Sequence, residues 1–329
     1  MLDQAHLDTF YLRDPSKQVN EKYSQKSKEY LDSIHAENTL DSYESDWKDF
    51  FYWCNQNRLN PLPASPENVV NYIAYLADGV KANTIARRLS AISANHTAAG
   101  YADDKNPAAD STVRRTLRSI RRKKGTIQHG KAPLLLEDMH AMANCFDTSD
   151  IAGKRDKALM FTGFAGAFRR SELVGLDADD LQFSREGVQI MIRKSKGDQD
   201  GGGQKLGLPY SETPLSCPVV ALKDWLQAAQ ITTGPLFRPI NRHKQVRDQR
   251  LTDKSVANIV KKYAEMIGLD GDDFAGHSLR RGFATSAAQH DVDERSIMKQ
   301  TRHKSERMVR RYIAEGNIFK DNPLSKMKL

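Results

Sequence analysis

Apolar residues recur at helical spacing through the first 125 residues of the chain. In residues 38–54, NTLDSYESDWKDFFYWC, they return every three or four positions, which is typical of one buried stripe on an amphipathic helix. Residues 65–79 predict a second helix, with Ser65 as its N-cap, Pro66 in its first turn and Gly79 at its end. Two further stripes predict two more helices: Ile85, Leu89 and Ile92, and then Val113, Leu117 and Ile120.

The pattern changes after residue 125. Residues 126–133 hold glycine, proline and basic residues between two periodic stretches, and this composition predicts a linker. Helical spacing then resumes, until Val188, Ile190 and Ile192 occupy every second position ahead of a glycine-rich loop. This alternation predicts a β-hairpin. After Pro218 the pattern favours helices and loops.

These patterns predict a mainly α protein with two domains, and a chain of 329 residues favours the same division. We expect a flexible N-terminal arm over residues 1–20 and a helical core-binding domain over residues 21–125. The linker of residues 126–133 would lead to an α+β catalytic domain with a small antiparallel sheet over residues 134–329.

Basic residues are concentrated in two helical stretches. The formal net charge of +8 favours a polyanionic partner. Residues 111–125, STVRRTLRSIRRKKG, carry seven basic side chains and no acidic one, and residues 299–312 are nearly as basic. One basic run is often only a solvated helix face, but two runs that also carry an apolar stripe favour binding to double-stranded DNA.

The DNA-binding residues expected from this charge pattern are Arg87, Arg88, Arg114, Arg115, Arg118, Arg121, Arg122, Lys123 and Lys124. Most of these cations would meet phosphates and supply affinity without reading sequence. Arg87 and Arg88, on a separate helix, are the candidates for base contacts in the major groove.

The composition disfavours several other classes of protein. No apolar run approaches the length that spans a bilayer, and the N-terminus lacks a signal-peptide pattern, so we expect a cytoplasmic protein with no membrane partner. The cysteines Cys54, Cys145 and Cys217 lie far apart without a C-x-x-C pair, which favours a reducing compartment.

Two tracts contain residue types that occur in nucleotide or metal sites. The tract GGGQK, residues 201–205, lacks the Ser or Thr that follows the lysine of a P-loop. The acidic tract DADD, residues 177–180, follows a helix and predicts a turn and a cap. We therefore expect no metal and no cofactor.

Four stretches of the second domain contain residues that could carry out chemistry. They are Arg169 and Glu172 in AFRRSEL, Lys196 beside the hairpin loop, His277 and Arg280 in GHSLRRG, and His303 and Tyr312 in RHKSERMVRRY. Each residue alone has an ordinary structural interpretation, such as a surface ion pair, a solvated lysine or a helix cap. Together they supply every group that cleavage of a phosphodiester requires.

A phosphodiester carries one negative charge and gains a second in its five-coordinate transition state. Two arginines can bind the non-bridging oxygens through forked, charge-assisted hydrogen bonds. A histidine can exchange a proton near neutral pH, a tyrosine hydroxyl can attack phosphorus, and a lysine can protonate the departing sugar oxygen. The set holds one carboxylate and several cations, which favours chemistry in which arginines take the place of a metal ion.

In this order and spacing, the four stretches resemble the conserved boxes of the tyrosine recombinase (phage integrase) family, and the two-domain layout is most similar to Cre- and Xer-type recombinases. The resemblance covers residues 130–315. It implies that Arg169 and Arg280 clamp the scissile phosphate. It also implies that Tyr312 attacks this phosphate, which forms a 3′-phosphotyrosyl bond and frees a 5′-hydroxyl.

The resemblance assigns the remaining residues as well. It implies that His277 is a base or a phosphate ligand, that Lys196 is the acid for the 5′-oxygen, and that His303 contacts the phosphate and supports the tyrosine. Glu172 would orient its neighbours. Some positions have a competitor close by: Arg170 beside Arg169, Arg281 beside Arg280, and Lys194 and Lys205 on either side of Lys196. Spacing favours the first arginine of each pair but does not decide the lysine.

The chain beyond the tyrosine is more apolar than a solvated tail, with Ile318, Phe319, Leu324, Met327 and Leu329. These residues either pack on their own domain or, as the resemblance implies, place residues 313–329 in a neighbouring subunit. The second alternative predicts a homotetramer on two DNA sites with inverted-repeat half-sites. A protein that acts on such DNA is expected to be nucleoid-associated. A nicking-closing enzyme similar to type IB topoisomerases and a DNA-binding protein without catalysis are the competing hypotheses.

Overall fold

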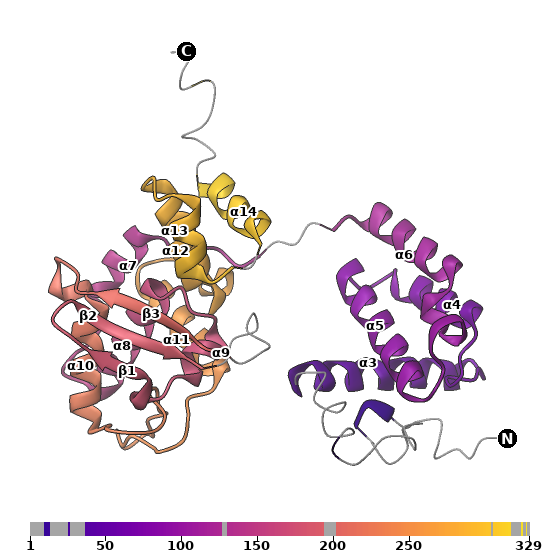
Figure 1. The fold of residues 1–329 in the computed structure, drawn as a ribbon, viewed down its shortest axis with the longest axis horizontal. Helices are drawn as coiled ribbons and strands as arrows, with labels where there is room; N and C mark the ends of the chain where they lie inside the picture. The colour runs from indigo at the N-terminus through magenta and orange to yellow at the C-terminus, as the bar shows by residue number, and fades with distance from the viewer. Residues whose placement is uncertain are drawn as a thin grey trace. The chain divides into compact units, whose positions relative to one another are not determined.

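The computed structural model describes residues 10–13, 26, 37–126, 130–193, 202–303, 305–316, 324 and 327. It divides into two compact units, Met1–His129 and Gly130–Leu329. Helices dominate both units, and a small antiparallel sheet lies in the second (Figure 1). The predicted fold class, a helical domain followed by an α+β domain, is confirmed.

The first unit is a helical bundle in its described part. Its helices are α3 (Glu37–Gln56), α4 (Pro66–Leu76), α5 (Ala82–Ala98) and α6 (Ser111–Lys124), with the 3-10 turns η2 (Asp103–Lys105) and η3 (Pro107–Ala109) between the last two. The predicted apolar stripes form the core, because Trp47, Phe50, Ile85, Ile92 and Val113 are all fully buried.

Helix α4 begins as its sequence predicts and ends earlier. Ser65 is the N-cap, and its hydroxyl oxygen accepts a hydrogen bond from Asn68 N at 3.3 Å. The helix ends at Leu76 with Ala77 as its C-cap, so the expected end at Gly79 is wrong by about one turn.

Part of the N-terminal arm is packed against the first unit. In and beside the 3-10 turn η1 (Tyr11–Arg13), Phe10 and Tyr11 are buried, and Tyr11 N donates to Asn95 Oδ1 of α5 at 2.7 Å. Arg13 forms ion pairs with acidic residues of α3. The expectation of a flexible arm over residues 1–20 is therefore wrong at residues 10–13, because two aromatic side chains gain burial there.

The expected linker is also shorter than its composition suggests. Ala132 N donates to Asp273 O at 2.8 Å, and Leu134 N donates to Ser278 O at 3.0 Å. These bonds attach residues 130–133 to the second unit, which begins at Gly130.

The second unit is built around one buried helix. Its helices are α7 (Leu136–Ala143), α8 (Ile151–Ala165), α9 (Arg170–Gly175), α10 (Pro218–Ala229), α11 (Asp253–Met266), α12 (His277–Gln289), α13 (Glu294–Thr301) and α14 (Glu306–Gly316). The 3-10 turns are η4 (Ala178–Asp180), η5 (Pro214–Ser216) and η6 (Gly271–Asp273). Helix α8 contacts α10, α11 and α12 and is buried on nearly every side, so it forms the centre of the core.

The sheet consists of β1 (Leu181–Phe183), β2 (Gly187–Ile192) and β3 (Gln204–Pro209). Strands β2 and β3 are antiparallel, with Val188 opposite Leu208 and Ile192 opposite Gln204, which confirms the predicted hairpin. Val188, Ile190 and Ile192 are buried, as their alternation indicates. Strand β1 was not predicted, because three residues are too few to establish a period.

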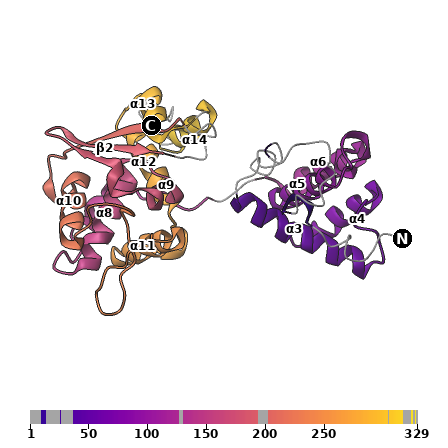
Figure 2. The same cartoon turned by 60° about the horizontal axis from the view of Figure 1, so that its bottom comes forward.

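The last three helices form a subdomain of the second unit. Helices α12, α13 and α14 contact one another and lie side by side in both views (Figures 1 and 2). Their small apolar core consists of Ala284, Ala288, Ile297 and Val309. Tyr312 and Ile313 of α14 pack against this core, which fixes the face of α14 that carries the tyrosine.

Candidate active site

The first part of the site is the corner between α8 and α9. Ala167 has a φ of +44°, in the left-handed region that few residues other than glycine adopt. Gly166 permits this turn, because a Cβ there would lie 2.1 Å from the ring of Phe168. The sharp corner places Arg169 at the start of α9, where its side chain can face the other elements of the site.

Glu172 holds Arg169 in place. Arg169 N donates to Glu172 Oε2 at 3.0 Å, and Arg169 Nη1 lies 2.5 Å from Oε1. Burial alone would raise the pKa of the Glu172 carboxyl, but Arg302 and Arg169 outweigh burial and hold its pKa below the ordinary value. Glu172 is therefore ionised at neutral pH, and it orients Arg169 through two separate bonds.

Helix α12 contributes a buried arginine. Arg280 Nη1 donates to Ala167 O at 2.8 Å, whereas Nη2 is buried and has no hydrogen-bond partner among the described residues. Burial, together with the charges of Arg169 and Arg302, lowers the pKa of Arg280 to about 9. The guanidinium is still charged at neutral pH, so it presents a charged donor that the described residues do not use.

His277 begins the same helix, one turn before Arg280. Loss of solvation lowers the pKa of His277, and the charges of Arg170, Arg280 and Arg169 lower it further. The ring is therefore neutral at pH 7, with an acceptor nitrogen available for a proton.

His303, in the segment that joins α13 to α14, and Tyr312, on α14, complete the site. Their ring centroids are 5.8 Å apart. Thr301 Oγ1 donates to Ile297 O at 2.7 Å and lies 2.7 Å from His303 Nδ1. Because the hydroxyl has one proton, Nδ1–H must donate to it, which leaves His303 Nε2 unprotonated. Burial and the neighbouring arginines lower the pKa of His303 to about 4.

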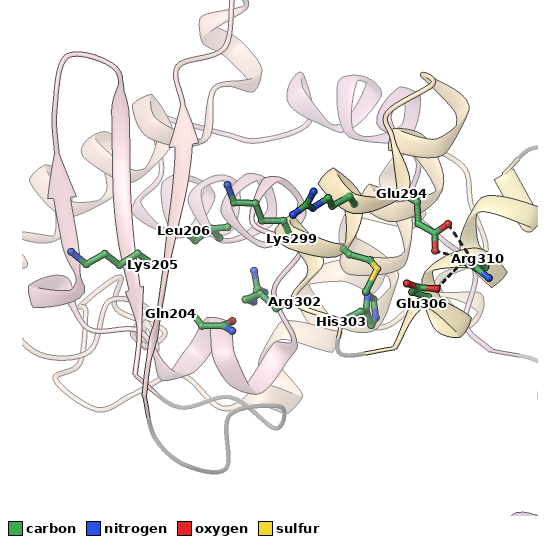
Figure 3. A pocket seen from close by; sticks show the side chains of 11 residues that line it. Gln204, Lys205, Leu206, Glu294, Lys299, Arg302, His303, Glu306 and Arg310 are labelled. Carbon is green, nitrogen blue, oxygen red and sulfur yellow. Dashed lines mark hydrogen bonds and ion pairs between the residues drawn. The ribbon is translucent and has the colours of Figure 1, made fainter.

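A cavity of about 810 Å³ opens beside His303 (Figure 3). Residues of β3, α13, α14 and the segment between the two helices line it: Gln204, Lys205, Leu206, Glu294, Arg295, Met298, Lys299, Arg302, His303, Glu306 and Arg310. Five of the eleven are Lys or Arg, and two are Glu, both of which pair with Arg310. The cavity wall is therefore predominantly cationic next to the site.

The structure also brings Arg302 into the site, a residue that the sequence did not single out. Its Nη2 lies 3.0 Å from Glu172 Oε2, and its side chain is 4% exposed. The sequence carries no signal for this position, because Arg302 is one of several arginines in a basic run.

The arginines adjacent to the two predicted ones have other partners. Arg170 Nε lies 3.0 Å from Asp253 Oδ2. Arg281 donates from Nη1 to Lys131 O at 2.7 Å and pairs through Nη2 with Glu315 at 2.6 Å. Both therefore hold parts of the second unit together. Arg169 and Arg280 instead bind Glu172 and the Ala167 carbonyl, at the corner between α8 and α9.

Comparison with known proteins agrees with this architecture. The model of the phage integrase family matches residues 134–317, and that of the phage integrase N-terminal SAM-like domain matches residues 28–100. The chain belongs to the phage integrase family. It is 56% identical over 308 residues to the integrase/recombinase xerD homolog of Selenomonas ruminantium, covering 94% of this chain and 90% of that one. It is 27% identical to the tyrosine recombinase XerC of Syntrophus aciditrophicus, covering 84% and 86%. The chain is thus a tyrosine recombinase.

Solved structures share the fold of this recombinase. The XerH site-specific recombinase bound to palindromic difH substrate has a TM-score of 0.64 at 14% identity, covering 98% of this chain and 94% of that chain. A lambda integrase dimer bound to a COC′ core site has a TM-score of 0.57 at 16% identity, covering 88% and 93%. At these identities the likeness establishes the arrangement of the elements.

The structure does not describe the lysine that is predicted to protonate the 5′-oxygen. Lys194 and Lys196 lie outside the described residues. Lys205 is described, near the start of β3, and it lines the cavity beside His303. The assignment of Lys196 stays a prediction.

The predicted DNA-binding residues differ in their surroundings. All seven cations of α6 are exposed: Arg114, Arg115, Arg118, Arg121, Arg122, Lys123 and Lys124. Arg87 and Arg88 instead pair with α3, since Arg87 Nη1 lies 2.6 Å from Asp46 Oδ2 and Arg88 Nη1 lies 2.6 Å from Asp49 Oδ1. Base contacts by these two would require them to leave those partners, so α6 is the stronger candidate for contact with phosphates.

The acidic tract DADD stabilises the fold. Asp177 pairs with Arg250 at 2.5 Å, and Asp180 pairs with Arg193 at 2.6 Å, around the 3-10 turn η4. Among the residues that the structure describes, no three His, Cys, Asp or Glu side chains group as metal ligands. No helix in the described ranges is long and apolar enough to cross a membrane.

Proposed function

We propose that the recombinase cleaves and rejoins double-stranded DNA at specific sites through a 3′-phosphotyrosyl intermediate. The observation that carries this proposal is the buried, charged Arg280, whose Nη2 has no partner among the described residues. A buried donor without a partner is costly, so its presence favours an anionic ligand at that point. A DNA phosphate supplies the charge and the acceptor oxygens, and Arg169 supplies the second half of the clamp.

The chemistry follows from the groups around that phosphate. The Tyr312 oxygen forms a bond to phosphorus as the bond from phosphorus to the 5′-oxygen breaks. The tyrosine proton passes to a base, and the 5′-oxygen takes a proton from an acid, for which Lys196 is the candidate. A 5′-hydroxyl from another strand then attacks the phosphotyrosine and releases the tyrosine. The covalent bond conserves the energy of the phosphodiester, so rejoining requires no ATP.

The two histidines supply the acceptor for the tyrosine proton. His303 is a candidate, because the hydrogen bond with Thr301 leaves its Nε2 unprotonated and its ring lies 5.8 Å from the Tyr312 ring. Its pKa of about 4 makes it a weak base in the free protein. A bound phosphate brings negative charge to the arginine cluster, which raises the pKa of His303 and His277 toward the working range.

Covalent trapping tests the proposal without knowledge of the target. The protein is incubated with a library of duplexes that carry a single nick beside a randomised segment, and complexes that survive denaturation are isolated and sequenced. We expect a covalent adduct with recovered DNA of common sequence. The adduct should disappear in Tyr312→Phe, and persistence there would contradict the assignment of the nucleophile.

Adjacent arginines offer matched controls for the clamp. Arg169→Gln should abolish adduct formation on the recovered DNA, whereas Arg170→Gln should retain it, because Arg170 pairs with Asp253 and not with Glu172. Equal loss in both variants would show that general charge, and not the clamp, governs cleavage.

We propose that the protein acts on nucleoid DNA in the cytoplasm and that α6 binds this DNA. The exposed cations of this helix, four of which fall in its last turn, suit contacts with successive phosphates. All three cysteines are free in the structure, in keeping with a reducing compartment.

We further propose that four copies act together on two sites with inverted half-sites, joined by residues 313–329. Met327 in this tail is 64% exposed. A cavity of about 420 Å³, lined by apolar residues of α7, α8 and α12 such as Met139, Phe161 and Phe283, offers a place for an apolar side chain of a neighbouring copy. The XerH structure with its palindromic substrate supports inverted half-sites.

Light scattering on the recovered DNA tests the assembly. We expect the intact protein to form complexes that contain four copies, and Met327→Asp to stop at fewer. Ser325→Asp adds the same charge to the same tail and should keep the full assembly. A full assembly in Met327→Asp, or in a chain that ends at residue 316, would refute the role of the tail. Relaxation of supercoiled DNA by a single copy would instead favour the topoisomerase hypothesis.

A further inference from the structure

Arg302 occupies an unusual position in the site. It follows the last residue of α13 with a φ of +56°, a conformation that a residue with a Cβ adopts at a cost. Its side chain is 4% exposed, which is rare for an arginine. A strained backbone and a buried cation at one residue, next to His303, call for a compensating role.

The side chain reaches the corner between α8 and α9. Arg302 Nη1 donates to Gly166 O at 2.8 Å, and Nη2 donates to Ala167 O and Glu172 Oε2, both at 3.0 Å. The guanidinium also lies over the ring of Phe168, 5.0 Å from its centroid. Every one of these partners lies at least 130 residues away along the chain.

Arg302 shares one acceptor with each arginine of the clamp. The Ala167 carbonyl accepts from both Arg302 Nη2 and Arg280 Nη1. The Glu172 carboxylate accepts from both Arg302 Nη2 and Arg169 Nη1. The same guanidinium therefore fixes the two groups that orient the clamp, and it belongs to the segment that carries His303.

We propose that Arg302 is a positioning residue that locks Arg169 and Arg280 to the segment bearing His303 and Tyr312. It acts through Glu172 and the Ala167 carbonyl and does not touch the phosphate. The inference rests on the proposed function of the site, so its test must distinguish a failure of the positioning role from a failure of the proposed function.

The competing explanation is that Arg302 only stabilises the fold or only adds positive charge. Arg302→Lys separates these possibilities, because a lysine keeps the charge but cannot serve three acceptors from a planar fork. Arg302→Met removes the charge and keeps the bulk. Arg155→Met is the matched control, since Arg155 of α8 lies outside the site, is 13% exposed, and donates to Asp156 and to the Arg238 carbonyl in the same unit.

The main measurement is the single-turnover rate of adduct formation on saturating recovered DNA, across pH. We expect Arg302→Lys and Arg302→Met to reduce the rate at least tenfold while the affinity for DNA changes less than threefold. In Arg302→Met the loss should grow as the pH falls, because the Glu172 carboxyl loses its partner and takes up a proton more readily. Arg155→Met should cleave like the parent. A rate in Arg302→Lys equal to that of the parent, or a pH profile in Arg302→Met parallel to it, would overturn the proposal.

A double-mutant comparison adds a second criterion. If Arg302 acts through Glu172, the fold-losses of Arg302→Met and Glu172→Gln should not multiply when combined. Losses that multiply would show that Arg302 acts independently of Glu172, contrary to the proposal.

Binding of inorganic vanadate provides a readout that does not need DNA cleavage. We expect Arg302→Lys to weaken vanadate binding at least fivefold, with Arg155→Met unchanged; equal binding by Arg302→Lys and the parent would refute the inference. If the parent binds vanadate but forms no adduct with any DNA, the proposed function fails while the positioning role is still decided by this comparison.

Discussion

His96 makes the stability of the first unit depend on pH. The side chain is fully buried on α5, where Nδ1–H donates to Ile92 O at 2.8 Å and Nε2 accepts from Ala64 N at 3.0 Å. Protonation of Nε2 would place a second N–H against the Ala64 N–H. Burial disfavours the charged ring as well, and the pKa of His96 is lowered from the ordinary 6.5 to about 4.

The sign and size of the effect follow from this difference. Because the unfolded chain binds the proton more readily than the folded one, the free energy of unfolding falls as the pH is lowered from above 6.5 toward 4. A difference of about 2.5 pH units corresponds to about 3 kcal/mol in full. Between about pH 7.5 and about pH 5, the expected loss is about 2 kcal/mol.

Urea unfolding at the two pH values measures this loss, with His96→Gln as the comparison. Tryptophan fluorescence follows the first unit when both proteins also carry Trp225→Phe, because the other two tryptophans, Trp47 and Trp53, lie on α3. Trp47 packs edge-on against His96 with ring centroids 5.9 Å apart. The variant cannot titrate at this position, so its stability should fall by about 2 kcal/mol less than that of the parent over this range. Parallel losses in the two proteins would refute the reasoning, because the loss would then come from other groups.

Three further predictions concern the second unit and the basic helix. Arg280→Gln should lower the rate of cleavage about 100- to 1,000-fold, as for other charge-stabilising donors, while Arg281→Gln should keep it, as measured by adduct formation. Gly282→Ala should lower the melting temperature of the second unit sharply, because its Cβ would lie 1.6 Å from a backbone carbonyl oxygen, whereas Gly175→Ala, with open space around it, should not. Arg121→Gln should weaken binding to every DNA sequence alike and reduce the slope of log affinity against log salt by about 0.9, as titrations at several salt concentrations would show.

Much of the site is predictable because its signal is local. His277 and Arg280 stand three apart within α12, and this spacing places both on one helix face wherever the helix lies. Arg169 and Glu172 also stand three apart, but Arg169 is the N-cap of α9 and meets Glu172 through a capping box. The order of the four stretches identified the family. The hairpin followed from the alternation of Val188, Ile190 and Ile192, which requires no knowledge of the partner strand.

Other features depend on contacts that no local pattern contains. Arg88 is indistinguishable in sequence from an exposed cation of α6, yet Asp49, 39 residues earlier, holds it within the first unit. Phe10 and Tyr11 have no periodic neighbours, and only the surface they pack against makes them part of the core.

The sequence by itself determined the helices, the hairpin and the set of groups for phosphate chemistry, because each rests on the spacing of nearby residues. The tertiary structure decided which arginine faces which partner. Arg302 and Glu172 are 130 residues apart, and they meet only because α13 packs beside the corner between α8 and α9. The direction of a long charged side chain is set by the acceptors that folding brings within its reach, and a linear pattern does not contain them.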